Sequence, residues 1–178
     1  DHAEVFTELK EYYKQTSESD TTKISFYEDT YSLYNLYRFA HYYEEAYGKY
    51  IWLKSGASLV IEHTEAMTVI DVNTGSVLKK KKQEDTLFYQ INREAAKEIA
   101  RQLRLRNISG IIMIDFINMK DTAQKEKLLS LLDSECKKDR VHCNVIDMTA
   151  LNLVEMTRSK VRKPLHEQIR SCMKNNRS

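Results

Sequence analysis

The sequence predicts a mixed α/β (α+β) fold in which helices flank a mixed β-sheet. Short apolar runs that suit strands alternate with longer segments whose apolar residues recur every three to four positions, as in helices. One proline and four glycines in 178 residues leave little room for long loops. With 42% hydrophobic and 30% charged residues, a chain of this length can bury a core and remain well hydrated outside it.

The front of the chain favours helices. Residues 3–15 (AEVFTELKEYYKQ) carry apolar side chains at helical spacing and predict a first helix. Residues 23–28 (KISFYE) predict a short strand. A second series of apolar residues, at i, i+3 and i+4, predicts one amphipathic helix from Thr30, near its N-cap, to Tyr47, with Gly48 as its stop.

Beyond Gly48 strands become frequent. Residues 50–72 contain three β-rich runs broken by KSG and HTEA, which predicts a meander of strands. Residues 84–107 predict a helix with one apolar stripe, which consists of Phe88, Ile91, Ala95, Ile99 and Leu103. Further along, we expect strands at 109–116, 142–149 and 151–160, a helix at 121–139 capped by Asp121 or Thr122, and a closing helix at 164–174 with Pro164 in its first turn.

Charge and tyrosine content divide the chain into two parts. Residues 1–50 carry 5 Lys and Arg against 10 Asp and Glu, together with ten of the eleven tyrosines. Residues 51–178 carry 23 basic against 16 acidic side chains, so an anionic partner should bind there. We therefore predict two domains, 1–50 and 51–178.

Several classes of protein are disfavoured. No run of about 18 apolar residues predicts a membrane span, and the polar N-terminal segment lacks the apolar region of a signal peptide, so we expect a cytoplasmic protein. Three cysteines without CxxC spacing favour reduced, partly buried thiols over a disulfide framework or a cysteine zinc site. The histidines also lack ligand spacing, and we expect structural roles for His2, His41, His63, His142 and His166.

Two predicted strands end in the same way. MTVIDVN ends with Asp71 and Asn73, and GIIMIDF ends with Asp115. A predicted helix separates them, as is typical of neighbouring strands joined by a crossover, whose ends emerge at the same edge of a sheet. Two carboxylates and an amide oxygen at one edge suit Mg²⁺ better than zinc. Such an ion, bound to a phosphodiester, can polarise it and supply a nucleophilic hydroxide.

Basic side chains in the second part suggest a polyanionic partner, and the candidates are Lys79, Lys80, Lys81, Lys82, Arg101, Arg104 and Arg106. Each feature also has an ordinary structural explanation. An aspartate near a strand end is commonly a turn or cap residue, a lysine run is commonly a solvated loop, and arginines suit the end of a helix dipole. From the residues alone, phosphate chemistry and ordinary structure both stay open.

Longer motifs add a family resemblance. The segments WLKSGASLVIEHTEAMTVIDVNTG, EAAKEIARQLRLRNISGIIMIDFINM and LVEMTRSK resemble the catalytic region of the ribonuclease E/G family, nearly continuously from about Trp52 to Lys160. The resemblance implies that residues 51–178 form a deoxyribonuclease-I-like catalytic subdomain. Residues 1–50 resemble, more loosely, the end of the RNase-H-like subdomain that precedes it.

The resemblance also implies an activity. In the family, the aspartates that match Asp71 and Asp115 hold a catalytic Mg²⁺, and the asparagine that matches Asn73 supports the site. For this chain we expect Mg²⁺, with Mn²⁺ as an alternative. We therefore expect an endoribonuclease of RNA processing and decay, rRNA processing included. It would cleave single-stranded RNA by attack of a metal-activated water and leave a 5′-phosphate and a 3′-hydroxyl.

The chain also departs from the family pattern. SVLKKKK follows DVNTG where a glycine and a short basic segment are usual, His142 stands where a basic residue often follows DR, and Asn152 replaces a glycine before LVEMTR. Because the chain begins with Asp1, we expect a fragment without the family's RNA-binding OB-fold and its 5′-phosphate sensor. The cysteine pair of the family's zinc link is not found, so no zinc is expected and homo-oligomerisation stays open.

Two further hypotheses compete with the endoribonuclease. A non-catalytic RNA-binding or assembly module would share the fold without turnover, but three converging oxygen ligands favour the enzyme. A nucleotide-binding α/β domain is disfavoured because the sequence contains no glycine-rich phosphate loop.

Overall fold

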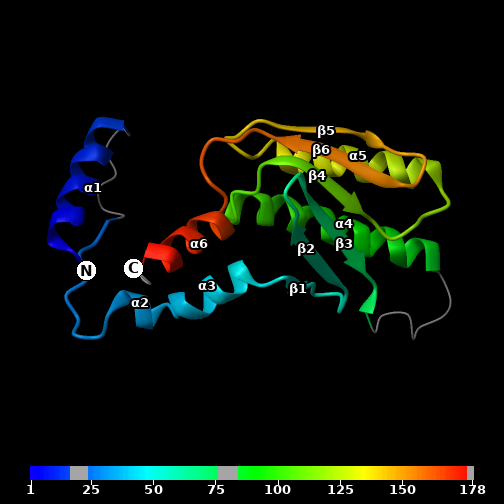
Figure 1. Ribbon diagram of the computed structural model, residues 1–178. Helices are drawn as coiled ribbons and strands as arrows, with labels where there is room; N and C mark the ends of the chain where they lie inside the picture. The colour runs from blue at the N-terminus through cyan, green and yellow to red at the C-terminus, as the bar shows by residue number, and fades with distance from the viewer. Residues whose placement is uncertain (17–23, 76–83, 176–178) are drawn as a thin grey trace. The chain divides into compact units, whose positions relative to one another are not determined.

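The computed structural model describes residues 1–16, 24–75 and 84–175, and the chain divides into two compact units, Asp1–Glu44 and Glu45–Ser178 (Figure 1). The first unit contains α1 (Ala3–Thr16), α2 (Leu33–Leu36) and most of α3 (Phe39–Tyr47). The second contains all six strands and the remaining helices. In the described parts of the chain, no helix is long and apolar enough to cross a membrane.

The first unit corrects two predictions. Residues 24–28 form no strand, and the predicted helix from Thr30 to Tyr47 is interrupted. Ser32, rather than Thr30, is the N-cap, and its side chain accepts a hydrogen bond from the backbone N–H of Asn35. The interruption follows α2, where Arg38 adopts a left-handed backbone with φ of +50°. The spacing of apolar residues therefore predicted the helical face but not the break, because helix propensity does not indicate a single left-handed residue.

The second unit is built on a six-stranded mixed sheet with strand order β1-β2-β3-β4-β6-β5. Its strands are β1 (Tyr50–Trp52), β2 (Ser58–His63), β3 (Met67–Asn73), β4 (Gly110–Asp115), β5 (Cys143–Met148) and β6 (Leu153–Arg158). β3 and β4 pair in parallel, and the other neighbouring strands in this sheet pair antiparallel. Helices flank the sheet, which confirms the predicted fold class.

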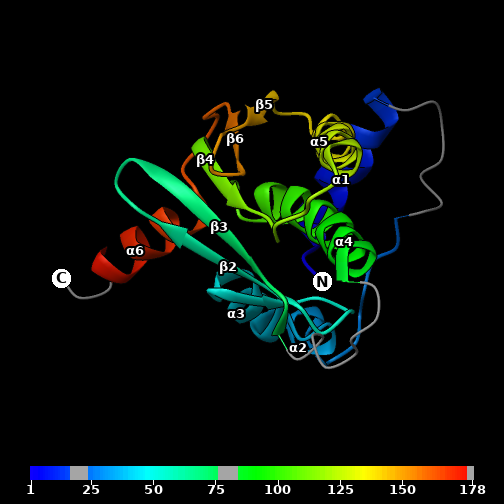
Figure 2. The same ribbon diagram turned by 90° about the vertical axis from the view of Figure 1, so that its right-hand side faces the viewer.

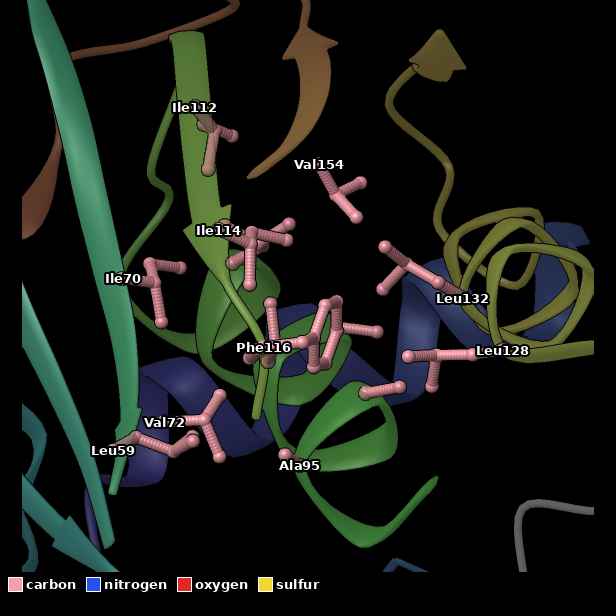
Figure 3. Packing of buried hydrophobic residues seen from close by; sticks show 14 of the residues in the cluster. Leu59, Ile70, Val72, Ala95, Ile112, Ile114, Phe116, Leu128, Leu132 and Val154 are labelled. Carbon is pink, nitrogen blue, oxygen red and sulfur yellow. The ribbon is translucent and has the colours of Figure 1, made fainter. Parts of the chain in front are cut away.

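One face of the sheet carries the hydrophobic core. The buried side chains of β3, β4 and β6 pack against α4 (Glu84–Leu105) and α5 (Thr122–Cys136), with Ile70, Ile114 and Val154 facing Ala95, Leu128 and Leu132 (Figure 3). Figure 2 shows α4 and α5 on the same side of the strands. Asp121 caps α5 by accepting a hydrogen bond from the Ala123 N–H, as predicted.

The opposite face, called the open face below, consists of the alternate residues of the same strands. On β3 these are Val69, Asp71 and Asn73, which are half-buried or exposed, whereas Ile70 and Val72 between them are buried. The same alternation continues on β1, β4 and β6. Since side chains alternate between the faces of a strand, this pattern assigns each residue to one face.

The closing helix α6 (Leu165–Asn175) lies beside the end of α4 rather than beside the end of β3. The Leu165 N–H donates to the carbonyl oxygen of Arg106, and the rings of His63 and His166 stack with centroids 3.9 Å apart. α4 crosses back from the end of β3 to the start of β4. Its C-terminal end therefore lies at the opposite end of the strands from Asp71.

Candidate functional site

Asp71 and Asp115 are brought together by the parallel pair of strands. The register aligns them directly, as the last of five pairs that begin with Met67 and Ile111. Residues aligned across neighbouring strands point to the same face, and here that is the open face. Asp71 is half-buried and Asp115 is exposed, so both carboxylates can be reached from solvent.

The two carboxylates interact electrostatically. Partial burial, and then the negative charge of Asp71, raise the pKa of Asp115 above its ordinary value. The charge of Asp71 therefore makes the ionised form of Asp115 less favourable. A bound cation would remove this repulsion, and a pair of carboxylates in this state is a typical ligand set for a divalent ion.

Asn73 fixes the orientation of Asp71. Its Nδ2 donates a hydrogen bond of 2.7 Å to Oδ2 of Asp71 from two positions further along β3, on the same face. Of the sequence-predicted site residues, the structure thus brings Asp71, Asn73 and Asp115 together.

A buried asparagine, which the sequence analysis missed, holds the strand end that carries Asp115. Asn92 on α4 is fully buried and makes two hydrogen bonds to the backbone of Ile117. Its Nδ2 donates to the Ile117 carbonyl oxygen at 2.8 Å, and its Oδ1 accepts from the Ile117 N–H at 3.0 Å. The signal available in the sequence was an asparagine within the apolar face of a helix, where a polar residue needs a partner.

Two glycines hold the end of β3 against the turn between β1 and β2. Gly75 has a left-handed backbone with φ of +56°, and a Cβ atom added there would lie 2.6 Å from the carbonyl oxygen of Gly56. No other residue type fits this approach without displacing the backbone. The motifs KSG and NTG, which are distant in sequence, therefore meet beside the site.

The predicted arginines lie away from the aspartates. Arg101 and Arg104 belong to the last turns of α4, on the core side of the sheet, where they line a depression together with Trp52 and Lys54. Arg106 just follows α4, at the opposite end of the strands from Asp71. Arg101 forms an ion pair with Glu98, and Arg104 donates to the Glu135 carbonyl oxygen. Arg106 is buried and donates to Gln102 and to the Gly48 carbonyl oxygen. RNA binding by Arg101, Arg104 and Arg106 stays a prediction, although the burial of Arg106 leaves its side chain little access to RNA. Lys79, Lys80, Lys81 and Lys82 lie outside the described residues.

Comparison with known proteins decides the family. A sequence model of the ribonuclease E/G family matches residues 1–161. The chain belongs to the ribonuclease E/G family. It is 40% identical to ribonuclease G of Haemophilus influenzae over 160 residues, which is 90% of this chain and 32% of that protein. It is 41% identical to ribonuclease G of Escherichia coli K12 over 145 residues, which is 82% of this chain and 29% of that protein.

A ribonuclease E is also related: the protein from Nostoc sp. PCC 7120 is 35% identical over 162 residues, which is 89% of this chain and 23% of that protein. The chain thus spans a third or less of the length of these relatives. The match confirms the family resemblance seen in the sequence motifs.

The structure explains one departure from the ribonuclease E/G pattern. Asn152, which replaces a glycine, adopts a left-handed backbone with φ of +64° in the turn between β5 and β6. Asparagine is one of the few residues other than glycine that tolerate this conformation. Its Oδ1 also accepts a hydrogen bond from Nζ of Lys125. His142, at another departure, is exposed.

Proposed function

We propose that this chain is the catalytic part of a metal-dependent endoribonuclease that cleaves single-stranded RNA during RNA processing and decay. The observation that carries the proposal is the alignment of Asp71 with Asp115 on one face, with Asn73 hydrogen-bonded to Asp71. Membership of the ribonuclease E/G family supports the same reaction. We assign residues 51–178 to a deoxyribonuclease-I-like subdomain and residues 1–50 to the end of an RNase-H-like subdomain.

The ligand atoms suit magnesium. Asp71 and Asp115 offer two carboxylates, and Mg²⁺ prefers such hard oxygen ligands. It binds through one or two carboxylates and completes its shell with water and substrate phosphate. The charge of Asp71 contributes to the raised pKa of Asp115, and a bound cation would offset this repulsion.

Each residue has a distinct role in this proposal. Asp71 and Asp115 would hold the ion, and Asn73 and Asn92 are positioning residues that fix Asp71 and the end of β4. When bound, the ion would polarise the phosphoryl oxygen and supply a hydroxide for attack on phosphorus. Because both carboxylates point from the open face, the scissile phosphate would lie on that face.

The proposal is tested by cleavage of a short AU-rich single-stranded RNA that carries a 5′-monophosphate, with and without Mg²⁺. We expect 5′-phosphate and 3′-hydroxyl products only with the metal. Asp71→Asn should lose at least about 100-fold in rate, because it removes half of the charge that holds the ion. Glu65→Gln, which removes one charge from the turn between β2 and β3, is the matched control and should keep the wild-type rate.

Cleavage that survives Asp71→Asn unchanged would refute the assigned site. RNA that binds but is never cleaved, with no stabilisation of the protein by Mg²⁺ or Mn²⁺, would instead favour a non-catalytic RNA-binding module.

A further inference from the structure

The edge strand β1 presents two aromatic side chains to solvent. Tyr50 and Trp52 are 59% and 73% exposed, whereas Ile51 between them is buried in the core. Trp52 is the only tryptophan in the sequence. Neither ring belongs to the hydrophobic core, so both are available for contact with a ligand.

The register of the sheet places both rings in line with the candidate metal site. Tyr50 pairs with Val60, which pairs with Asp71, and Asp71 pairs with Asp115. Trp52 is aligned in the same way with Ser58 and Asn73. Aligned residues share a face, so Tyr50 and Trp52 lie on the open face with the carboxylates.

The separation suits nucleotides of one strand that lie a few positions apart. A single strand, β2, lies between β1 and β3, so the two rows of side chains are about 10 Å apart at a strand spacing of about 4.8 Å. A stacked nucleic-acid strand advances about 3.4 Å per nucleotide, so this distance corresponds to about three nucleotides, and fewer in an extended strand. The intervening Ser58 and Val60 have short side chains that reach less far from the sheet than the rings.

The charge of the open face explains why stacking would be needed there. Asp71, Asp115 and Glu155 lie on it and repel phosphate groups, whereas Glu62 is paired with Lys49, whose Nζ also lies 5.7 Å from the centre of the Tyr50 ring. A base that stacks on an aromatic ring gains affinity without a positive charge, and it does so with little regard to sequence because every base has a π-face.

We propose that Tyr50 and Trp52 form a stacking platform for unpaired bases of the RNA, next to the phosphate held at Asp71 and Asp115. The inference rests on the proposed function and deepens it, since it adds a base-binding subsite on β1. An unpaired base is the ligand because bases in a duplex already stack on their neighbours and cannot lie flat on a side chain.

The emission of Trp52 reports on the platform directly, because no other tryptophan contributes. The full chain would be titrated in EDTA with the AU-rich RNA and, separately, with an abasic ribose-phosphate strand of equal length and charge. Fluorescence anisotropy of labelled RNA would measure the affinity of Trp52→Ala, Trp52→Phe and the control Leu151→Ala, which removes an equally exposed side chain from the turn between β5 and β6.

We expect the RNA, and not the abasic strand, to quench Trp52. Trp52→Ala should weaken binding by about 5-fold to 100-fold, Trp52→Phe should restore most of the affinity, and Leu151→Ala should match the wild type. Circular dichroism would establish that each variant is folded.

Three results would overturn the platform. One such result is that Trp52→Ala binds and cleaves RNA normally while RNA leaves the Trp52 emission of the wild type unchanged. This result would refute the platform and leave the proposed function intact. Emission that changes with protein concentration alone, with self-association lost in Trp52→Ala, would identify Trp52 as a contact between copies of the chain. Absence of both binding and Mg²⁺-dependent cleavage would refute the proposed function and the platform together.

Discussion

Substitution of Asp115 by asparagine should separate stability from function. The change keeps the shape of the side chain and removes the charge that Asp71 opposes. We expect the metal-free protein to become more stable. We also expect it to lose the stabilisation by Mg²⁺ and the RNA cleavage that we propose. A residue that lowers the stability of the empty site is typical of a ligand that functions only with its ion.

The magnitude follows from the register. Adjacent strands lie about 4.8 Å apart. If the carboxylates are separated by this strand spacing, two unit charges interact by about 0.9 kcal/mol in water and about 3.5 kcal/mol at an effective dielectric constant of 20. Asp115 is exposed, so the lower figure applies. A gain of about 1 kcal/mol raises the unfolding midpoint of a chain of this size by about 2–4 °C.

The pH dependence of stability shows in which direction Asp115→Asn should act. The pKa of Asp115 is raised in the folded state, so the unfolded chain releases this proton first as pH rises. The contribution of Asp115 to stability is therefore fully present below its unfolded pKa, about 3.9, and is lost as pH rises through the higher folded pKa. Asp115→Asn should gain most over the wild type at neutral pH and little at pH below about 3.9.

Thermal unfolding followed by circular dichroism in EDTA, across this pH range and at low salt, measures the effect. Glu65→Gln removes the same charge far from Asp71 and controls for net charge. Midpoints that rise equally in both variants, or a midpoint that falls in Asp115→Asn, would refute the argument from repulsion.

Two further substitutions test the supports of the sheet. Gly75→Ala should destabilise the protein by about 1–3 kcal/mol more than Gly110→Ala in urea unfolding, since both glycines have positive φ but only a Cβ at Gly75 would meet a backbone oxygen; equal costs would refute the proposed contact with Gly56. Asp139→Ala should cost about 3–5 kcal/mol, because it leaves the buried Arg158 without its carboxylate. Burial alone would raise the pKa of Asp139, but hydrogen bonds from Arg158 and the Val141 N–H, with the Arg158 charge, lower it below its ordinary value. Its stabilisation is therefore present above its unfolded pKa and lost as pH falls through the folded pKa, and acid unfolding of Asp139→Asn should lack this component.

Sequence periodicity predicted the second unit well, because its elements are long and strongly patterned. The stripe of α4 is buried from Ile91 to Leu103, and the aspartates lie on neighbouring parallel strands as the crossover required. The first unit was predicted less well. Its break at Arg38 depends on one left-handed residue, and a short strand at residues 23–28 could form only with a pairing partner.

The site could be predicted only in part. Strand ends and family motifs indicated Asp71, Asn73 and Asp115, but not the contact between Asn92 and Ile117, which depends on how α4 packs against the sheet. The sequence also did not predict where the arginines lie. Their charge indicates attraction to RNA, whereas only the packing and direction of α4 show their position relative to the sheet.

The parallel pairing of β3 and β4 has a consequence for biosynthesis. Asp71 and Asp115 are 44 residues apart in sequence and meet only when α4 has formed and crossed back over the sheet. Such non-local pairs form late, since the intervening chain must first be ordered. A nascent chain still growing on the ribosome would therefore present no complete pair of carboxylates until β4 had emerged and docked. Under the proposed function, the messenger RNA being translated would therefore meet no complete pair of metal ligands on the nascent chain until that stage.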